Sequence, residues 1–121
     1  MVGKLRGSVL LYGPLLARFG RARLAPPGGD FPARRTISAH LQALKAMGAT
    51  EVSSDGEGRV LQVLDGLRPA SIYMEEASVT GTETAILAAA SAPGTTEIRQ
   101  AACEPHVVEL CEFLRGMGAD I

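Results

Sequence analysis

The sequence holds 121 residues, which is enough for one modest domain with its own hydrophobic core. Hydrophobic residues make up 46% and charged residues 21%, and the formal net charge is −1, so composition gives no sign of a general nucleic-acid-binding or membrane-binding surface. Two cysteines, Cys103 and Cys111, are too few for a disulfide framework, and no run approaches the ~18 apolar residues of a membrane span. We therefore expect a cytoplasmic protein with free thiols and an aliphatic core.

The first half of the chain alternates helix and strand signals. An apolar run at residues 8–19 predicts a helix, although Pro14 lies inside it and should remove a hydrogen bond and bend it. A short strand-like run follows at residues 22–25. A second helix is predicted at residues 37–47, and Gly48 suits the left-handed position that often follows a helix.

Two further strands complete this first half. Residues 50–52 form one strand candidate, and residues 59–64 alternate in character and form another. Asp55 and Gly56 lie between them and supply a hairpin-type turn. Residues 1–66 therefore form a unit of helix, strand, helix and two strands.

The second half shows the same order of signals. It opens with a strand candidate at residues 70–74 and continues with an apolar helix at residues 82–92. Thr80 and Glu83 have the spacing of a capping box before that helix. A strand-like run at residues 95–99 follows.

The last predicted helix, at residues 106–117, matches the helix that closes the first unit. Pro105 fits its first turn, Gly118 fits the left-handed position after it, and residues 120–121 are a strand candidate. Both helices place residues at i, i+3 and i+6 on one face: Leu41, Leu44 and Met47 in the first, and Cys111, Leu114 and Met117 in the second. Residues 67–121 thus form a second unit that stops where its last strands should begin.

This repetition predicts an α/β fold built from repeated α/β units, with helices packed on mixed sheets. The first unit is 1–66 and the second, truncated unit is 67–121. We interpret the whole segment, 1–121, as part of a larger domain.

The loop before the second helix carries the strongest chemical signal. Gly28 and Gly29 bring backbone N–H groups close to a ligand, and Arg34 and Arg35 stand at the mouth of a helix N-terminus, which favours anions. Asp30 is a carboxylate on the same loop. The alternative is a Pro/Gly turn with solvated arginines and an Asp that bonds its own backbone.

Four segments in register resemble one known family. They are GPLLARFG at 13–20, PGGDFPARR at 27–35, SVTGTET at 78–84 and ACEPHVVEL at 102–110. Together they resemble the catalytic domain of enolpyruvyl transferases that act on UDP-N-acetylglucosamine. The resemblance implies an inside-out α/β barrel domain made of three repeated units, a second domain, and an active site between the two. The chain would then be a partial catalytic domain.

The resemblance also implies two catalytic residues. Asp30 matches the loop position where many relatives carry a reactive Cys, which fosfomycin alkylates, and some carry Asp. That position is described as a proton donor or a participant in product release. Arg35 matches the arginine that holds phosphoenolpyruvate. The family's general base and catalytic lysine lie outside this segment, so the chain is expected to be inactive alone.

Further residues match substrate contacts of the family. Those implied to bind substrate are Arg6, Arg35, Thr36, Ile37, Ser38, Ala39, His40, Ser78 and Val79. Glu104 matches a carboxylate that lies near the loop, and Arg34, which replaces a small residue of the relatives, is expected to add positive charge beside the anion site. Ser38 stands where relatives usually have Asp. No Cys, His or Asp cluster has metal-ligand spacing, so neither a metal nor a cofactor is expected.

The implied activity is transfer of an enolpyruvyl group from phosphoenolpyruvate to the 3-hydroxyl of UDP-N-acetylglucosamine, in peptidoglycan precursor synthesis. The expected partners are these two substrates and the second domain of the same chain, with no nucleic acid and no membrane. Two alternatives remain open. One is a non-catalytic module that binds UDP-sugars or another protein, and the other is the related enolpyruvyl transferase that acts on 3-phosphoshikimate.

Overall fold

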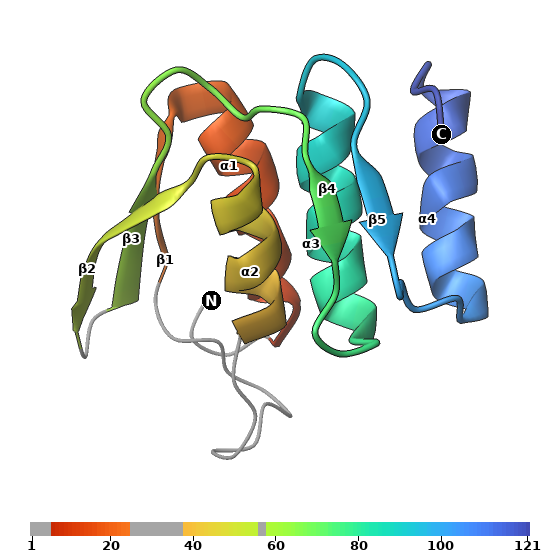
Figure 1. Cartoon of the computed structure of the whole chain (residues 1–121), viewed down its shortest axis with the longest axis horizontal. Helices are drawn as coiled ribbons and strands as arrows, with labels where there is room; N and C mark the ends of the chain where they lie inside the picture. The colour runs from red at the N-terminus through yellow and green to blue at the C-terminus, as the bar shows by residue number, and fades with distance from the viewer. Residues whose placement is uncertain (1–5, 25–37, 56–57) are drawn as a thin grey trace.

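The computed structural model of the chain describes residues 6–24, 38–55 and 58–121 (Figure 1). Its elements follow the order η2 (Arg6–Leu11), α1 (Tyr12–Phe19), β1 (Arg21–Leu24), α2 (Ser38–Ala46), β2 (Thr50–Asp55), β3 (Gly58–Gln62), β4 (Ser71–Tyr73), α3 (Val79–Ser91), β5 (Glu97–Arg99) and α4 (Pro105–Gly116). Helices alternate with strands as the sequence predicted, and the α/β class is confirmed.

The strands form two small sheets. β1, β3 and β2 make an antiparallel sheet in that order, and β4 pairs with β5 in parallel. Asp55 pairs with Gly58, so the β2–β3 hairpin closes at the predicted place, although its turn lies outside the described residues. The register of β2 shifts between Glu51 and Ser53, which leaves Val52 50% exposed.

The first helix begins later than the sequence suggested. A 3-10 helix, η2, precedes it, and regular α-helical geometry starts at Tyr12. Pro14 therefore lies in the first α-helical turn, where the missing N–H removes no α-helical hydrogen bond. The prediction that Pro14 interrupts the helix interior was wrong. Gly20 ends α1 in the left-handed conformation, with φ 75°.

The helices α1 to α4 all run in the same direction, and β1, β4 and β5 return in the opposite one (Figure 1). α3 lies in the middle and packs against α1, α2 and α4. Gly13 permits a close approach of α1 to α3, because a Cβ on Gly13 would lie 3.2 Å from the backbone N of Ala88. The largest fully buried core side chains include Leu16, Leu44, Met47, Leu61, Ile72 and Met74.

The turns that end α2 and α4 have the same conformation, but the matching faces of the two helices differ in burial. Gly48 and Gly118 have φ of 105° and 104°, which confirms the left-handed turn predicted after each helix. Met47 is fully buried, whereas Met117 is 71% exposed.

The face of α4 that shares the spacing of the buried face of α2 is therefore not buried at its end. Cys111 and Leu114 are half-buried, and the fully covered residue of α4 is Val107. Residues 120–121 are not a strand in the structure. The physical reason is coverage: the segment after β3 packs over the end of α2, where the N–H of Arg68 donates to the carbonyl of Met47, and the described residues supply no equivalent over α4.

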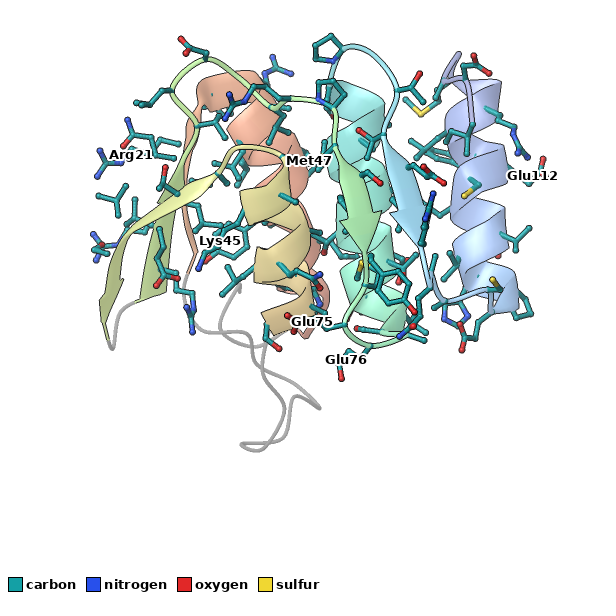
Figure 2. All side chains as sticks on the ribbon, viewed as in Figure 1. Arg21, Lys45, Met47, Glu75, Glu76 and Glu112 are labelled. Carbon is teal, nitrogen blue, oxygen red and sulfur yellow. The ribbon has the colours of Figure 1, made fainter. Side chains whose placement is uncertain are left out.

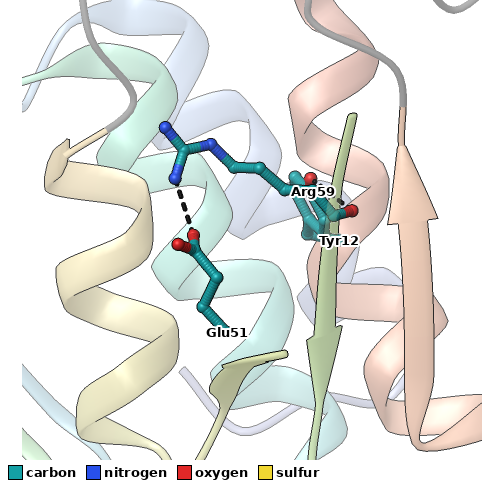
Figure 3. A network of polar contacts seen from close by, with 3 residues as sticks. All are labelled: Tyr12, Glu51 and Arg59. Carbon is teal, nitrogen blue, oxygen red and sulfur yellow. Dashed lines mark hydrogen bonds and ion pairs between the residues drawn. The ribbon is translucent and has the colours of Figure 1, made fainter. Parts of the chain in front are cut away.

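A polar contact ties α1 to the hairpin (Figure 3). The hydroxyl of Tyr12 donates to the carbonyl oxygen of Arg59 at 3.3 Å, and the Arg59 guanidinium pairs with the Glu51 carboxylate at 2.6 Å. Burial raises the pKa of Tyr12, and the charge of Arg59 opposes that rise. Within the described ranges, no helix has the length and apolar character needed to cross a membrane.

Candidate functional site

The N-terminal ends of the helices gather at one end of the molecule, the lower end in Figure 1. α2 and α3 lie side by side and in contact there. Backbone N–H groups in the first turn of a helix have no intrahelical partner, and the helix dipole is positive at that end. The paired first turns of α2 and α3 therefore form a site that favours anions.

His40 and Thr80 join these two turns. The Nε2 atom of His40 lies 2.8 Å from the hydroxyl oxygen of Thr80, which is 40 residues away in the sequence. His40 is only 3% exposed, so its ring is held within the fold rather than offered freely to solvent. The two residues connect the segments that the resemblance assigns to the nucleotide-sugar.

Ser78, rather than Thr80, caps α3. Its hydroxyl accepts a hydrogen bond from the N–H of Gly81 at 3.1 Å, and its backbone is extended, as a capping residue requires. The predicted capping box of Thr80 and Glu83 was wrong, because α3 begins at Val79 and the Thr80 hydroxyl is within hydrogen-bonding distance of His40 instead.

Small residues bring the two helices together. A Cβ on Gly81 would lie 3.1 Å from the Cβ of Ala39 and 3.1 Å from the hydroxyl oxygen of Ser78. Ala39 is 1% exposed, so its side chain packs against α3. Any larger side chain at position 81 would push the first turn of α2 away from that of α3.

Gln42 fixes the turn that leads from β4 into α3. Its amide nitrogen donates to the carbonyl of Tyr73 at 2.6 Å, and its amide oxygen accepts from the N–H of Glu75 at 3.1 Å. Sequence reasoning missed Gln42, and it gave Thr80 a capping role instead of the contact with His40. No local signal identifies them, since each acts on a segment about 30 to 40 residues away.

Two acidic residues lie near these turns. Figure 2 shows Glu75 and Glu76 at the end of the molecule where α2 and α3 begin, and both are exposed. Their negative charge opposes the helix N-termini for an anionic ligand, although solvent screens it. An anion at this end therefore needs further positive groups, and the sequence predicts these in Arg34 and Arg35.

The structure places only part of the predicted site. It brings together Ser38, Ala39 and His40 of α2 with Ser78 and Val79 at the start of α3. Glu104 precedes α4 and is exposed, with no side-chain bond to the helix that it caps. Predicted residues that lie outside the described part are Asp30, Arg34, Arg35, Thr36, Ile37 and the side chain of Arg6.

A separate hollow of about 430 Å³ lies elsewhere, at the C-terminal end of α3 and the start of β5. Small and apolar side chains such as Ala89, Ala92 and Ile98 line it, together with Asp120. A helix C-terminus and a carboxylate both disfavour an anion. This hollow is therefore a poor match for a phosphate-bearing ligand.

The described residues offer no metal centre. They contain no group of three or more His, Cys, Asp or Glu side chains that could hold a metal ion. Cys103 is exposed and Cys111 is half-buried, and both are free thiols.

Comparison with known proteins gives matches over nearly the whole chain. A profile of the family described as EPSP synthase (3-phosphoshikimate 1-carboxyvinyltransferase) matches residues 1–121. The UDP-N-acetylglucosamine 1-carboxyvinyltransferase of Treponema denticola is 49% identical over 118 residues, which cover 98% of this chain and 27% of that protein. The protein of the same name from Campylobacter fetus subsp. fetus is 46% identical over 121 residues, which cover 100% of this chain and 29% of that protein.

A solved structure matches as well. The enolpyruvyl transferase NikO from Streptomyces tendae superposes with a TM-score of 0.81 at 28% sequence identity, over 99% of this chain and 28% of that one. This chain therefore spans between a quarter and a third of the length of these proteins.

Proposed function

The chain belongs to the EPSP synthase (3-phosphoshikimate 1-carboxyvinyltransferase) family, and from this premise we propose that it forms part of an enzyme that acts on a nucleotide-sugar. That enzyme transfers an enolpyruvyl group from phosphoenolpyruvate to the 3-hydroxyl of UDP-N-acetylglucosamine. The observation that carries the proposal is the 49% identity, over 98% of this chain, to a UDP-N-acetylglucosamine 1-carboxyvinyltransferase. The reaction belongs to peptidoglycan precursor synthesis, and through it to cell shape, in the cytoplasm.

The chemistry is an addition followed by an elimination. The sugar hydroxyl adds to C2 of phosphoenolpyruvate while C3 takes up a proton, and the tetrahedral intermediate then loses phosphate from C2 and a proton from C3. Such a reaction needs clamped anions and a proton source close to C3. Arg35 supplies the clamp and Asp30 the proton in this proposal. The remaining groups come from other parts of the enzyme.

The first turns of α2 and α3 supply part of the nucleotide-sugar site. Ser38, His40, Ser78 and Val79 lie at the end where helix dipoles favour the diphosphate, and Arg6 extends this site. Residues 1–66 and 67–121 are proposed as successive repeat units of a partial catalytic domain, which a second domain completes.

Substrate choice separates this proposal from its nearest competitor. The family description names 3-phosphoshikimate, whereas the two relatives above are named for UDP-N-acetylglucosamine. A nucleotide-sugar presents a diphosphate and a uracil ring, and 3-phosphoshikimate presents a single phosphate and a carboxylate. The paired helix N-termini, with two connected segments to line a long ligand, favour the nucleotide-sugar.

The proposal is tested by a chimera in which this chain replaces the matching segment of the Treponema denticola enzyme. We expect the chimera to transfer enolpyruvyl to UDP-N-acetylglucosamine with kcat/KM within about 100-fold of the parent, since small misplacements of site residues carry costs of that order. The unmodified parent is the positive control, and 3-phosphoshikimate is the competing substrate. A folded chimera that prefers 3-phosphoshikimate would overturn the proposal that UDP-N-acetylglucosamine is the substrate. Tight binding of UDP-N-acetylglucosamine by the isolated chain, with an inactive folded chimera, would favour the non-catalytic module.

A further inference from the structure

We propose that Thr80 is a positioning residue, whose hydroxyl holds the imidazole of His40 and so fixes the first turn of α2 against the first turn of α3. The proposal rests on the nucleotide-sugar site described above and adds a residue that the resemblance does not assign. Its basis is the 2.8 Å contact between His40 Nε2 and the Thr80 hydroxyl. Buried polar groups are costly without a partner, so a ring that is 3% exposed depends on each bond it makes.

The hydroxyl groups along α3 have separate tasks. Ser78 caps the helix by accepting from the N–H of Gly81. Thr82, fully buried, accepts from the N–H of Ala102 and so ties α3 to the segment before α4. Because capping is already satisfied by Ser78, the Thr80 hydroxyl is left for a contact between helices.

The contact with His40 lies between two other contacts that join α2 to the segment around the start of α3. Ala39 packs against Gly81, His40 meets Thr80, and Gln42 bonds to the turn before α3. The outer two set how close the elements lie, by small side chains and by backbone bonds. The His40–Thr80 contact lies between them and sets the orientation of the ring.

The orientation of the His40 ring matters because the residues proposed to bind the nucleotide-sugar lie beside this contact. Ser78 and Val79 directly precede Thr80, and Ser38 and Ala39 directly precede His40. Binding sites lose affinity when their residues are misplaced by a fraction of an ångström to 1 Å. The side chain of Thr80 therefore affects binding through His40.

Thr84 provides a matched control one turn later on the same helix. It is fully buried, and its hydroxyl has no hydrogen-bond partner among the described residues. Thr80→Val and Thr84→Val each replace a hydroxyl by a methyl group of similar size. Only the first removes a bond to His40.

The experiment uses the 121-residue chain with 15N-labelled histidine, followed by titration with UDP-N-acetylglucosamine. We expect Thr80→Val to shift the imidazole 15N signals of His40, Thr80→Ser to restore them, and Thr84→Val to leave them unchanged. The dissociation constant should rise about 5- to 30-fold in Thr80→Val, as for the loss of one hydrogen bond, and stay within about twofold in the other two variants. Thr80→Ala carries the same expectation if Thr80→Val does not fold.

Unchanged His40 signals in Thr80→Val would overturn the proposal, and so would shifted signals with an unchanged dissociation constant, because the contact would then be structural only. If the wild-type chain does not bind UDP-N-acetylglucosamine, the proposal that this chain alone binds the nucleotide-sugar is refuted. The backbone amide signal of Ala39, recorded on the uniformly 15N-labelled chain, then decides the positioning role: a shift in Thr80→Val that Thr84→Val does not cause supports it, and no shift overturns it.

Discussion

Replacing Gly13 by alanine tests whether α1 and α3 meet as closely as the structure shows. A Cβ on Gly13 would lie 3.2 Å from the backbone N of Ala88 and 3.4 Å from both its Cα and its Cβ. Ala88 is fully buried in the last turn of α3, which is itself held between α1, α2 and α4. Because the nearest atom is backbone rather than the end of a flexible side chain, neither helix yields without disturbing other contacts.

The expected sign follows from two opposing magnitudes. Alanine gains up to about 1 kcal/mol over glycine in a helix interior, and less in a first turn. Overpacking a close contact costs about 1–3 kcal/mol. We therefore expect Gly13→Ala to destabilise the protein by about 1–2 kcal/mol and to lower the Tm by roughly 3–10 °C for a chain of this size.

Denaturant and thermal unfolding monitored by circular dichroism measure this effect. Gly116→Ala is the matched control, because it lies in α4 and a Cβ there meets nothing within 4 Å, so it should be neutral or stabilising. Adding Ala88→Gly to Gly13→Ala should not restore wild-type stability, since the contact with the backbone N remains and glycine inside α3 itself costs up to about 1 kcal/mol. If Gly13→Ala stabilises the protein as much as Gly116→Ala does, the close packing of α1 on α3 is refuted.

Three further predictions concern a buried phenol and the loop that is proposed to be catalytic. Tyr12→Phe removes the bond to the Arg59 carbonyl and should cost about 1 kcal/mol in urea unfolding. Burial raises the pKa of Tyr12, so the folded state holds the phenol proton more tightly than the unfolded state does. The wild type should therefore lose folding stability as the pH rises above ~10, and Tyr12→Phe should lose less stability over the same range. In the chimera with the Treponema denticola enzyme, Arg35→Lys should lower kcat/KM by about 30- to 1,000-fold, because the planar fork is lost; a near-normal value would place the clamp at Arg34. The same chimera should resist fosfomycin, because a carboxylate is a weaker nucleophile than a thiolate. Asp30→Cys should make the chimera sensitive, with a covalent adduct visible by mass spectrometry. Rapid inactivation of the unmodified chimera, with label on Asp30, would contradict this prediction.

Local signals in the sequence predicted most of the elements. Apolar periodicity located the helices, and Gly48 and Gly118 marked the ends of α2 and α4, because a left-handed residue after a helix has a local steric cause. Pro105 marked the start of α4 for a similar reason, as it occupies the first helical position.

The errors occurred where a distant partner decides the outcome. Met117 has the spacing of a buried residue, yet burial depends on what packs over it, and it is 71% exposed. Residues 120–121 have a strand-like composition, but a strand needs a partner to pair with. Thr80 has the right spacing for a capping box, and only the position of His40, 40 residues earlier, shows why its hydroxyl serves another purpose.

Connectivity explains why the predicted contact residues gather at one end. β4 and β5 are parallel neighbours, so the chain must return between them, and α3 makes that return in the opposite direction to both strands. α1 and α2 share this direction, so their N-terminal ends lie at the same end as that of α3. A fold of this kind collects positive helix ends at one end and negative ends at the other, whatever side chains it carries. The side chains then decide what is bound there, which is why a hydroxyl that orients one imidazole between two such ends has a functional consequence beyond its contribution to stability.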